Sequence, residues 1–127
     1  MTSTSSNLQP SVTNLSPLEY TRLTNPPLLI DVRSQLEYAT GHAPNASNLS
    51  LPRILIGIIP WFRNWVLPQW FRDLPKEQPI AVICLTAHRS PIAAEFLQKQ
   101  GFAQVFNITG GMMEWRQLKL EIVMGKS

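Results

Sequence analysis

The chain has 127 residues, a net charge of +3 and one cysteine. This length falls within the range of about 100–200 residues per domain, so we expect one domain whose core needs no disulfide or structural metal. A single cysteine and two widely separated histidines give no disulfide and no metal-ligand spacing, and the scattered basic residues give no sign of nucleic-acid binding.

The two ends of the sequence read as tails. The first seven residues, MTSTSSN, lack the basic start and the apolar core of a secretory signal, which predicts a cytoplasmic protein with a reduced cysteine. We expect residues 1–14 to be a disordered tail, residues 15–122 to form the domain and residues 123–127 to be a short C-terminal tail.

The first half of the chain predicts two short helices and two strands. The sequences SPLE and SQLE are capping boxes, and they predict a helix over residues 17–23 and a second one that Gly41 closes. The apolar residues 28–32 predict a strand between these helices. Residues 46–51 form a weaker strand candidate.

The second half continues the alternation of strands and helices. Residues 80–85 are the strongest strand candidate, and Ser90 is expected to cap a helix over residues 91–100. A strand over residues 105–108 and a last helix after the glycine pair at 110–111 complete the pattern. Short apolar strands that alternate with helices predict an α/β fold with a mostly parallel sheet covered on both faces.

Polar side chains and the cysteine follow three of these strands. Asp31 and Arg33 end the first, Cys84 the strongest and Thr109 the strand after it. Sites in parallel sheets form outside the carboxyl ends of the strands. We therefore expect these side chains to converge on one crevice.

Cys84 begins the loop CLTAHR, which leads from a strand into a helix. Successive backbone N–H groups in such a turn, together with the helix dipole, stabilise an anion. His88 and Arg89 add positive potential, so the loop favours a nucleophilic thiolate; for His88 we expect only an electrostatic or lining role. The alternative is a buried, inert cysteine, because free cysteine is among the most buried residue types.

Residues 53–72 carry three of the four tryptophans and three arginines, with no acidic residue. Pro60, Arg63 and Pro68 interrupt an apolar stretch that is about half of the ~20 residues needed to cross a bilayer. Two interpretations stay open. In the first, a helix and a loop fold over the crevice and the tryptophans complete the core, which is the commoner role of such residues. Alternatively, a partly exposed aromatic and basic surface contacts a partner protein or a membrane interface.

The order of several short motifs resembles that of a single-domain rhodanese over about residues 15–120. The motifs are Asp31-Val32-Arg33, Glu37-Tyr38 with Gly41-His42, Ala46 with Asn48-Leu49, Cys84-x4-Arg89-Ser90, and Gly110-Gly111 with Trp115. The Cys-x4-Arg string alone is unspecific, but this ordered set is specific. The resemblance implies a rhodanese-like α/β fold of about five short strands and sulfurtransferase chemistry.

By this resemblance Cys84 attacks the outer sulfur of a small donor and carries it as a persulfide. The acceptor is cyanide or a cellular thiol, including a protein thiol, and no metal or organic cofactor is needed. The loop that cradles the persulfide is Leu85, Thr86, Ala87, His88 and Arg89. Asp31 and Arg33, with Arg89, organise this loop from below or line its rim, and Ser90 supports it.

Two loop positions depart from the pattern of many family members, which carry a basic residue and a glycine where this chain has Leu85 and Ala87. The missing cation weakens attraction for a dianion such as thiosulfate, which predicts that the donor is a persulfide, a polysulfide or a protein-bound persulfide and that thiosulfate is used poorly. Alanine does not adopt positive φ freely, which predicts a strained or differently wound loop. Residues 53–72 resemble an insertion into a minimal rhodanese.

Two other functions compete with sulfur transfer. A cysteine phosphatase or arsenate reductase also combines a cysteine loop with an arginine, but related phosphatases have one more residue between them than separates Cys84 from Arg89. A non-catalytic rhodanese-like binding module would use the tryptophan-rich segment as its working surface. The intact Cys84 and Arg89 favour the enzyme.

Overall fold

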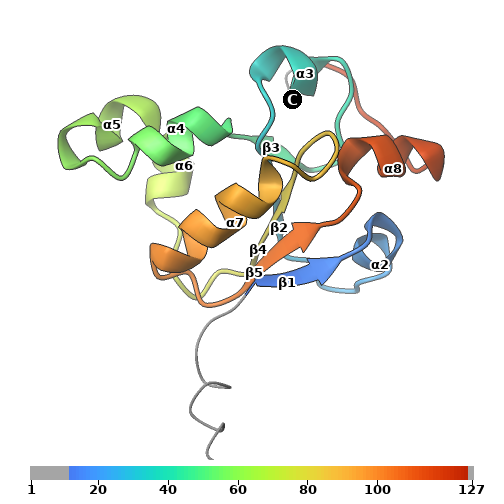
Figure 1. Cartoon of the computed structure of the whole chain (residues 1–127), viewed down its shortest axis with the longest axis horizontal. Helices are drawn as coiled ribbons and strands as arrows, with labels where there is room; N and C mark the ends of the chain where they lie inside the picture. The colour runs from blue at the N-terminus through green and yellow to red at the C-terminus, as the bar shows by residue number, and fades with distance from the viewer. Residues whose placement is uncertain (1–11, 126–127) are drawn as a thin grey trace, which may run out of the picture.

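A computed structural model describes residues 12–125 and shows a five-stranded parallel sheet (Figure 1). The strand order is β1-β5-β4-β2-β3, so β4, which precedes the cysteine, lies at the centre. The strands are β1 (Val12–Leu15), β2 (Leu28–Asp31), β3 (Ser47–Asn48), β4 (Ile80–Ile83) and β5 (Val105–Ile108). The predicted α/β fold with about five short parallel strands is confirmed.

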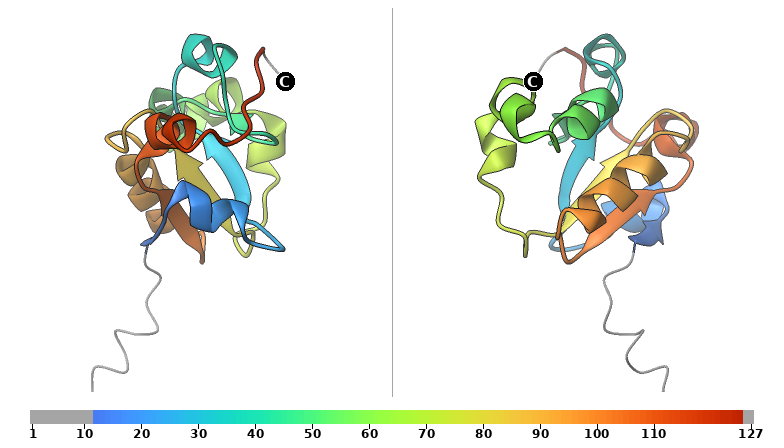
Figure 2. Two further views of the ribbon diagram at one scale, coloured as in Figure 1. Left: turned by 90° about the vertical axis from the view of Figure 1, so that its right-hand side faces the viewer. Right: turned by 60° about the vertical axis from the view of Figure 1, so that its left-hand side comes forward.

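Helices cover both faces of the sheet (Figure 2). One face packs against α4, α6 and α7, and the opposite face packs against α2, α3 and α8. The helical segments are α2 (Pro17–Thr21), α3 (Gln35–Ala39), α4 (Leu51–Ile56), the 3₁₀ turn η1 (Pro60–Phe62), α5 (Arg63–Val66), α6 (Gln69–Arg72), α7 (Ser90–Lys99) and α8 (Gly111–Gln117).

The central strand β4 is buried along its whole length and contributes to both cores. Ile80 and Val82 face the core beneath α7, whereas Ala81 and Ile83 face the core beneath α8. This alternation follows from the two-residue period of a strand. A strand that is apolar at every position is therefore the one that the fold places between two helical layers.

The capping boxes act as predicted at α2 and α3, where serine and glutamate each satisfy the other's backbone N–H. The prediction for α7 is wrong at its first turn. Arg89 is the N-cap, and Ser90 is the first helical residue. Its hydroxyl does not cap the helix because it is hydrogen-bonded to other side chains.

The domain extends further at both ends than the sequence indicates. Strand β1 begins at Val12, within the expected tail, and pairs with β5 in parallel register. Near the other end, Val123 exchanges two backbone hydrogen bonds of 2.8 Å with His42, so the predicted C-terminal tail also begins too early. The rest of the expected N-terminal tail, residues 1–11, and residues 126–127 lie outside the described residues.

Residues 53–72 fold into short helical pieces, and their tryptophans do not complete the core. Trp61 and Trp65 are 76% and 79% exposed, and Trp70 is 38% exposed. Ile54, Leu67 and Phe71 are the fully buried apolar side chains of this segment, and they enter the core beneath α7. The interpretation of the tryptophans as core residues is therefore wrong. Within residues 12–125, no helix has the length and apolar character to cross a bilayer.

Candidate active site

Cys84 lies directly after β4, at the carboxyl edge of the sheet, with only 1% of its surface exposed. The loop that follows curls around its sulfur before α7 begins. The backbone N–H of Ser90 lies 3.3 Å from Sγ, and the backbone N–H groups of Ala87 and Arg89 also favour the charged form of the sulfur. The loop therefore turns backbone donors towards this thiol.

These donors stabilise the charged form of the sulfur. Burial raises the pKa of the Cys84 thiol, whereas the Ser90 side chain and the three backbone N–H groups lower it, and the hydrogen bonds prevail. The pKa of Cys84 is therefore below its ordinary value. A lowered pKa favours the thiolate, which is the reactive form of a cysteine, whereas burial in an apolar core alone would shift the pKa upward.

A chain of polar side chains links Cys84 to the far edge of the sheet. Ser90 Oγ lies 3.3 Å from Cys84 Sγ and donates to Asn107 Oδ1 at 2.6 Å. Asn107 Nδ2 in turn donates to Asn14 Oδ1 at 3.2 Å. In this arrangement the thiol donates its proton to Ser90 Oγ. A thiolate would instead accept a hydrogen bond from the Ser90 hydroxyl, the same group that donates to Asn107 here.

Arg89 is paired with a carboxylate on the opposite side of the loop. Its guanidinium donates to both oxygens of Glu37 on α3, at 2.7 and 2.9 Å. Hydrogen bonds from Arg89 lower the pKa of Glu37 to about 2, even though burial opposes this shift. The same hydrogen bonds raise the pKa of Arg89, and the charge of Asp31 adds a smaller increase. The cation of the loop is therefore largely neutralised.

Asp31 and Arg33 form a buried ion pair beneath the site. Arg33 Nη2 lies 2.7 Å from Asp31 Oδ2, and both side chains are at most 2% exposed. Arg33 also donates to the carbonyl of Gly41 at 2.8 Å. These contacts fix the turn on either side of α3, which carries Glu37. Asp31 and Arg33 are thus buried next to α3 and are not among the described residues that line the adjacent pocket.

We expected Asp31, Arg33, Cys84 and Thr109 to converge on one crevice, and this prediction is only partly correct. The carboxyl ends of the strands meet at one edge, but Thr109 turns towards β1, where its backbone N–H donates to the carbonyl of Leu15 at 2.8 Å. The described residues that line the large pocket at this edge include neither Asp31 nor Arg33 nor Cys84.

Helix α8 anchors the beginning of the cysteine loop. The backbone N–H groups of Met112 and Met113 donate to the carbonyls of Cys84 and Leu85, at 2.7 and 2.9 Å. This contact requires glycine at position 111, where φ is +59° and an added Cβ would lie 2.5 Å from both carbonyl oxygens. The glycine at position 111 therefore allows the N-terminal end of α8 to pack directly against the backbone of Cys84.

The middle of the loop is exposed more than its ends. Leu85, Thr86 and Ala87 are half-buried and His88 is exposed, with Thr86 Oγ1 and His88 Nδ1 2.6 Å apart. Ala87 has φ of +67°, as the departure from glycine predicted. An alanine in this left-handed region costs about 1–2 kcal/mol. The loop therefore holds a strained residue beside the sulfur.

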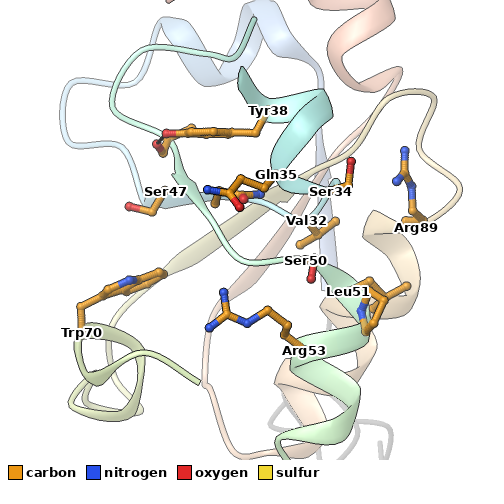
Figure 3. A pocket seen from close by; sticks show the side chains of 13 residues that line it. Val32, Ser34, Gln35, Tyr38, Ser47, Ser50, Leu51, Arg53, Trp70 and Arg89 are labelled. Carbon is orange, nitrogen blue, oxygen red and sulfur yellow. Dashed lines mark hydrogen bonds between the residues drawn. The ribbon is translucent and has the colours of Figure 1, made fainter. Parts of the chain in front are cut away.

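A pocket of about 900 Å³ opens beside this loop, between α3, β3 and the start of α4. Figure 3 shows Arg89 at one side of the pocket and Trp70 at the other, with Arg53 below. Of the loop residues 84–89, Arg89 lines it. The other polar residues around it are Ser34, Gln35, Ser47, Asn48 and Ser50. This pocket has room for a small donor or acceptor next to the cradle.

The fold and the site together define an α/β protein with a cysteine thiol in an anion-stabilising loop. Residues 16–118 match the family described as Rhodanese-like domain, and the chain belongs to this family. A protein named sulfurtransferase from Allochromatium vinosum is 33% identical over 96 residues, which are 76% of this chain and 78% of that protein. The resemblance inferred from the ordered motifs is confirmed.

Solved structures show the same fold. A rhodanese-related protein from Thermoplasma volcanium superposes with a TM-score of 0.69 at 22% identity, over 88% of this chain and 98% of that chain. The polysulfide-sulfur transferase homodimer of Wolinella succinogenes gives a TM-score of 0.67 at 28% identity, over 89% of this chain and 79% of that chain.

Three contributors to the site were not predicted from the sequence. Glu37 was recognised only as a capping residue and a family landmark, and Asn14 and Asn107 were not assigned to the site. For Asn107 a signal exists, since a polar residue that interrupts an apolar strand, here Val-Phe-Asn-Ile, needs a buried partner. Asn14 lies in a segment without strand character, so no signal marks it.

Proposed function

We propose that this protein is a sulfurtransferase that carries a sulfane sulfur as a persulfide on Cys84. In the first half-reaction the Cys84 thiolate attacks the outer sulfur of a donor R–S–S⁻, the S–S bond of the donor breaks, and the thiolate R–S⁻ leaves. In the second, cyanide or a cellular thiolate attacks the outer sulfur of the enzyme persulfide. Thiocyanate or a new persulfide forms, and the Cys84 thiolate is restored.

The observation that supports this cycle most directly is the ring of backbone donors around Sγ. The N–H groups of Ala87, Arg89 and Ser90 stabilise negative charge at Sγ, and the outer sulfur of a persulfide would carry its charge about 2 Å further along the same loop. Both the attacking thiolate and the terminal sulfur of the persulfide carry negative charge. Fixed dipoles of this kind serve both halves of the cycle, and a cytoplasmic setting would keep the thiol reduced.

The surroundings of the sulfur favour an organic persulfide donor over thiosulfate. Leu85 contributes no charge directly after the cysteine, and Arg89, the cation of the loop, is bound to Glu37 at 2.7 and 2.9 Å. A dianionic donor therefore finds little uncompensated positive charge at the loop. A donor with one charge and an organic part depends less on such charge and gains contact with the walls of the adjacent pocket.

Mass spectrometry of the intact protein tests the proposed cycle. After incubation with a persulfide donor we expect an adduct of about 32 Da, one sulfur atom, that cyanide or a thiol removes. The adduct should be absent from Cys84→Ser. Ser90 is retained in that variant, so the cradle of backbone donors is preserved. Failure of the wild-type protein to form the adduct with any sulfane donor would contradict the cycle and favour the binding module.

A further inference from the structure

The tip of the segment that follows α4 exposes large apolar side chains. Trp61 and Trp65 are 76% and 79% exposed, and Ile58 and Ile59 next to them are 45% and 36% exposed. We call these four residues the tryptophan tip. Soluble domains rarely gather such side chains on their surface unless the surface has a partner.

Buried contacts determine which way the tip points. The Leu67 side chain packs so closely on Gly57 that a Cβ at position 57 would lie 2.6 Å from it. The contact between Gly57 and Leu67 holds the two ends of this stretch together, so residues 58–66 project outward from it. Trp61 lies in the 3₁₀ turn η1 and Trp65 in α5, which follows it directly, so both belong to the projecting residues. Exposure of the tryptophans is thus built into the fold.

The tip is rimmed by positive charge that the protein does not neutralise. Arg53, Arg63 and Arg72 belong to the same segment, and no carboxylate within residues 12–125 forms an ion pair with any of them. Arg53 Nε donates to the carbonyl of Val66 at 2.7 Å, and Arg72 Nε donates to that of Leu67 at 3.1 Å. These bonds hold the side chains against the segment while leaving their charge uncompensated.

Lys76 adds to this basic region from the chain that follows α6. Burial lowers the pKa of Lys76, and the charge of Arg63 lowers it further, which shows that the two cations lie near one another. The nearest acidic residues in sequence lie outside the segment, at Glu37 before it and at Asp73 and Glu77 after it. Glu37 is bound to Arg89. Exposed tryptophans, isoleucines and unpaired arginines therefore occupy one region of the molecule.

We propose that the tryptophan tip and its arginines dock the protein on an anionic lipid bilayer. Tryptophan and arginine are the side chains that membrane–water interfaces favour, and arginines near an anionic leaflet each add about 1 kcal/mol of attraction. In Figure 1 the segment from α4 to α6 lies at the opposite end of the molecule from α2 and α8, so the tip reaches a flat surface unobstructed. Acyl chains rearrange around a protruding tip, whereas a protein partner needs a matching cavity.

The proposal also places the pocket beside the membrane. Trp70 and Arg53 belong to residues 53–72, as the tryptophan tip does, and they line the pocket next to Arg89. A donor or acceptor that partitions into lipid would then meet the pocket at the bilayer surface. The docking itself does not depend on sulfur transfer, and it can be measured without any assay of activity.

Co-sedimentation with vesicles is the primary test. We expect the full chain to sediment with vesicles of equal parts phosphatidylcholine and phosphatidylglycerol, and to bind phosphatidylcholine alone much less. The Trp61→Ser/Trp65→Ser variant should lose more than about tenfold in partitioning, because membrane binding scales with buried apolar area. Arg63→Gln and Arg72→Gln should each lose about fivefold at low salt.

Two matched control variants remove an apolar side chain or a positive charge at exposed positions outside residues 53–72. Leu36→Ser deletes an apolar side chain that is 82% exposed on α3, and Arg22→Gln deletes an exposed charge at the end of α2. Both should bind like the wild type. Brominated lipid should quench tryptophan fluorescence in the wild type and not in the double variant. Absence of sedimentation with anionic vesicles, or equal loss in the control variants, would overturn the proposal and leave the tip to a protein partner.

Discussion

Arg89 and Glu37 lie 52 positions apart in sequence and join the cysteine loop to α3 through two hydrogen bonds of 2.7 and 2.9 Å. The pair has a structural consequence and a chemical one. It clamps the last residue before α7 onto the helix opposite, and it withdraws the guanidinium charge from an incoming donor.

The Arg89–Glu37 pair should weaken in acid. The pKa of Glu37 is lowered from 4.5 to about 2, so its stabilising effect is fully present above pH 4.5 and is lost as the pH falls to about 2. Both side chains are about one-third exposed, so we expect a modest effect. Urea unfolding at several pH values should show a smaller loss of stability below pH 4.5 in Glu37→Gln than in the wild type. An identical loss in both proteins would contradict the assignment.

Leu85→Arg should lower the KM for thiosulfate in a thiosulfate:cyanide assay. The substitution places a cation directly after Cys84, while both carboxylate oxygens of Glu37 are already bound to Arg89, so the dianion gains attraction. Leu85→Gln is the matched control, because it introduces a polar side chain without charge. A low KM for thiosulfate in the wild type would contradict the preference for a persulfide donor.

Ser90→Ala should raise the pKa of Cys84, because the thiolate loses its side-chain hydrogen bond. The rate of alkylation by iodoacetamide, measured against pH, should shift its midpoint upward, so that less thiolate reacts at neutral pH. The substitution also leaves Asn107 Oδ1 without its donor, which costs about 1–3 kcal/mol. Ser47→Ala, in the pocket wall away from the sulfur, should leave the midpoint unchanged. An unshifted midpoint in Ser90→Ala would show that backbone donors alone set the pKa.

Gly111→Ala should destabilise the protein by more than about 2 kcal/mol in urea unfolding. The added methyl group would lie 2.5 Å from two backbone carbonyl oxygens, in a residue whose φ is +59°. Gly101→Ala separates the two causes, since φ is +108° there and the nearest atom lies 3.8 Å away on a flexible lysine. Gly101→Ala should therefore lower the free energy of unfolding by less than Gly111→Ala does. Equal losses would mean that backbone strain alone matters at position 111.

Ala87→Gly should stabilise the protein by about 0.5–1 kcal/mol. Glycine removes the cost of a left-handed alanine at φ of +67°, and the greater entropy of the unfolded chain offsets part of this gain. Ala93→Gly in α7 is the control and should destabilise, because a helix interior disfavours glycine. Reduced stability of Ala87→Gly would mean that the methyl group makes a contact that outweighs the strain.

The sequence predicted the fold well because its signals are local. Capping boxes mark the starts of α2 and α3, and a short apolar run marks β4, so both kinds of element follow from neighbouring residues. Strand β1 was missed because only two of its four residues, Val12 and Leu15, are apolar, and they do not alternate. An edge strand of this kind is defined by its partner β5.

The site was predicted less completely because the partners of its loop residues, Glu37 and Asn107, reach the loop through long-range contacts. Cys84 and the backbone cradle follow from one continuous loop. The pairing of Arg89 with Glu37, and of Ser90 with Asn107, depends on how separate elements pack. Ser90 shows the difficulty: as a serine before proline at a helix start it has the local pattern of an N-cap, and only the packing of β5 against α7 gives its hydroxyl another partner.

The contact between α8 and the cysteine loop joins two segments that are far apart in sequence. The backbone carbonyls of Cys84 and Leu85 accept hydrogen bonds from the N–H groups of Met112 and Met113. The backbone at the start of the cysteine loop is therefore held in place only while α8 is packed against it. Local unfolding of α8 would release this backbone even if the central sheet stayed intact.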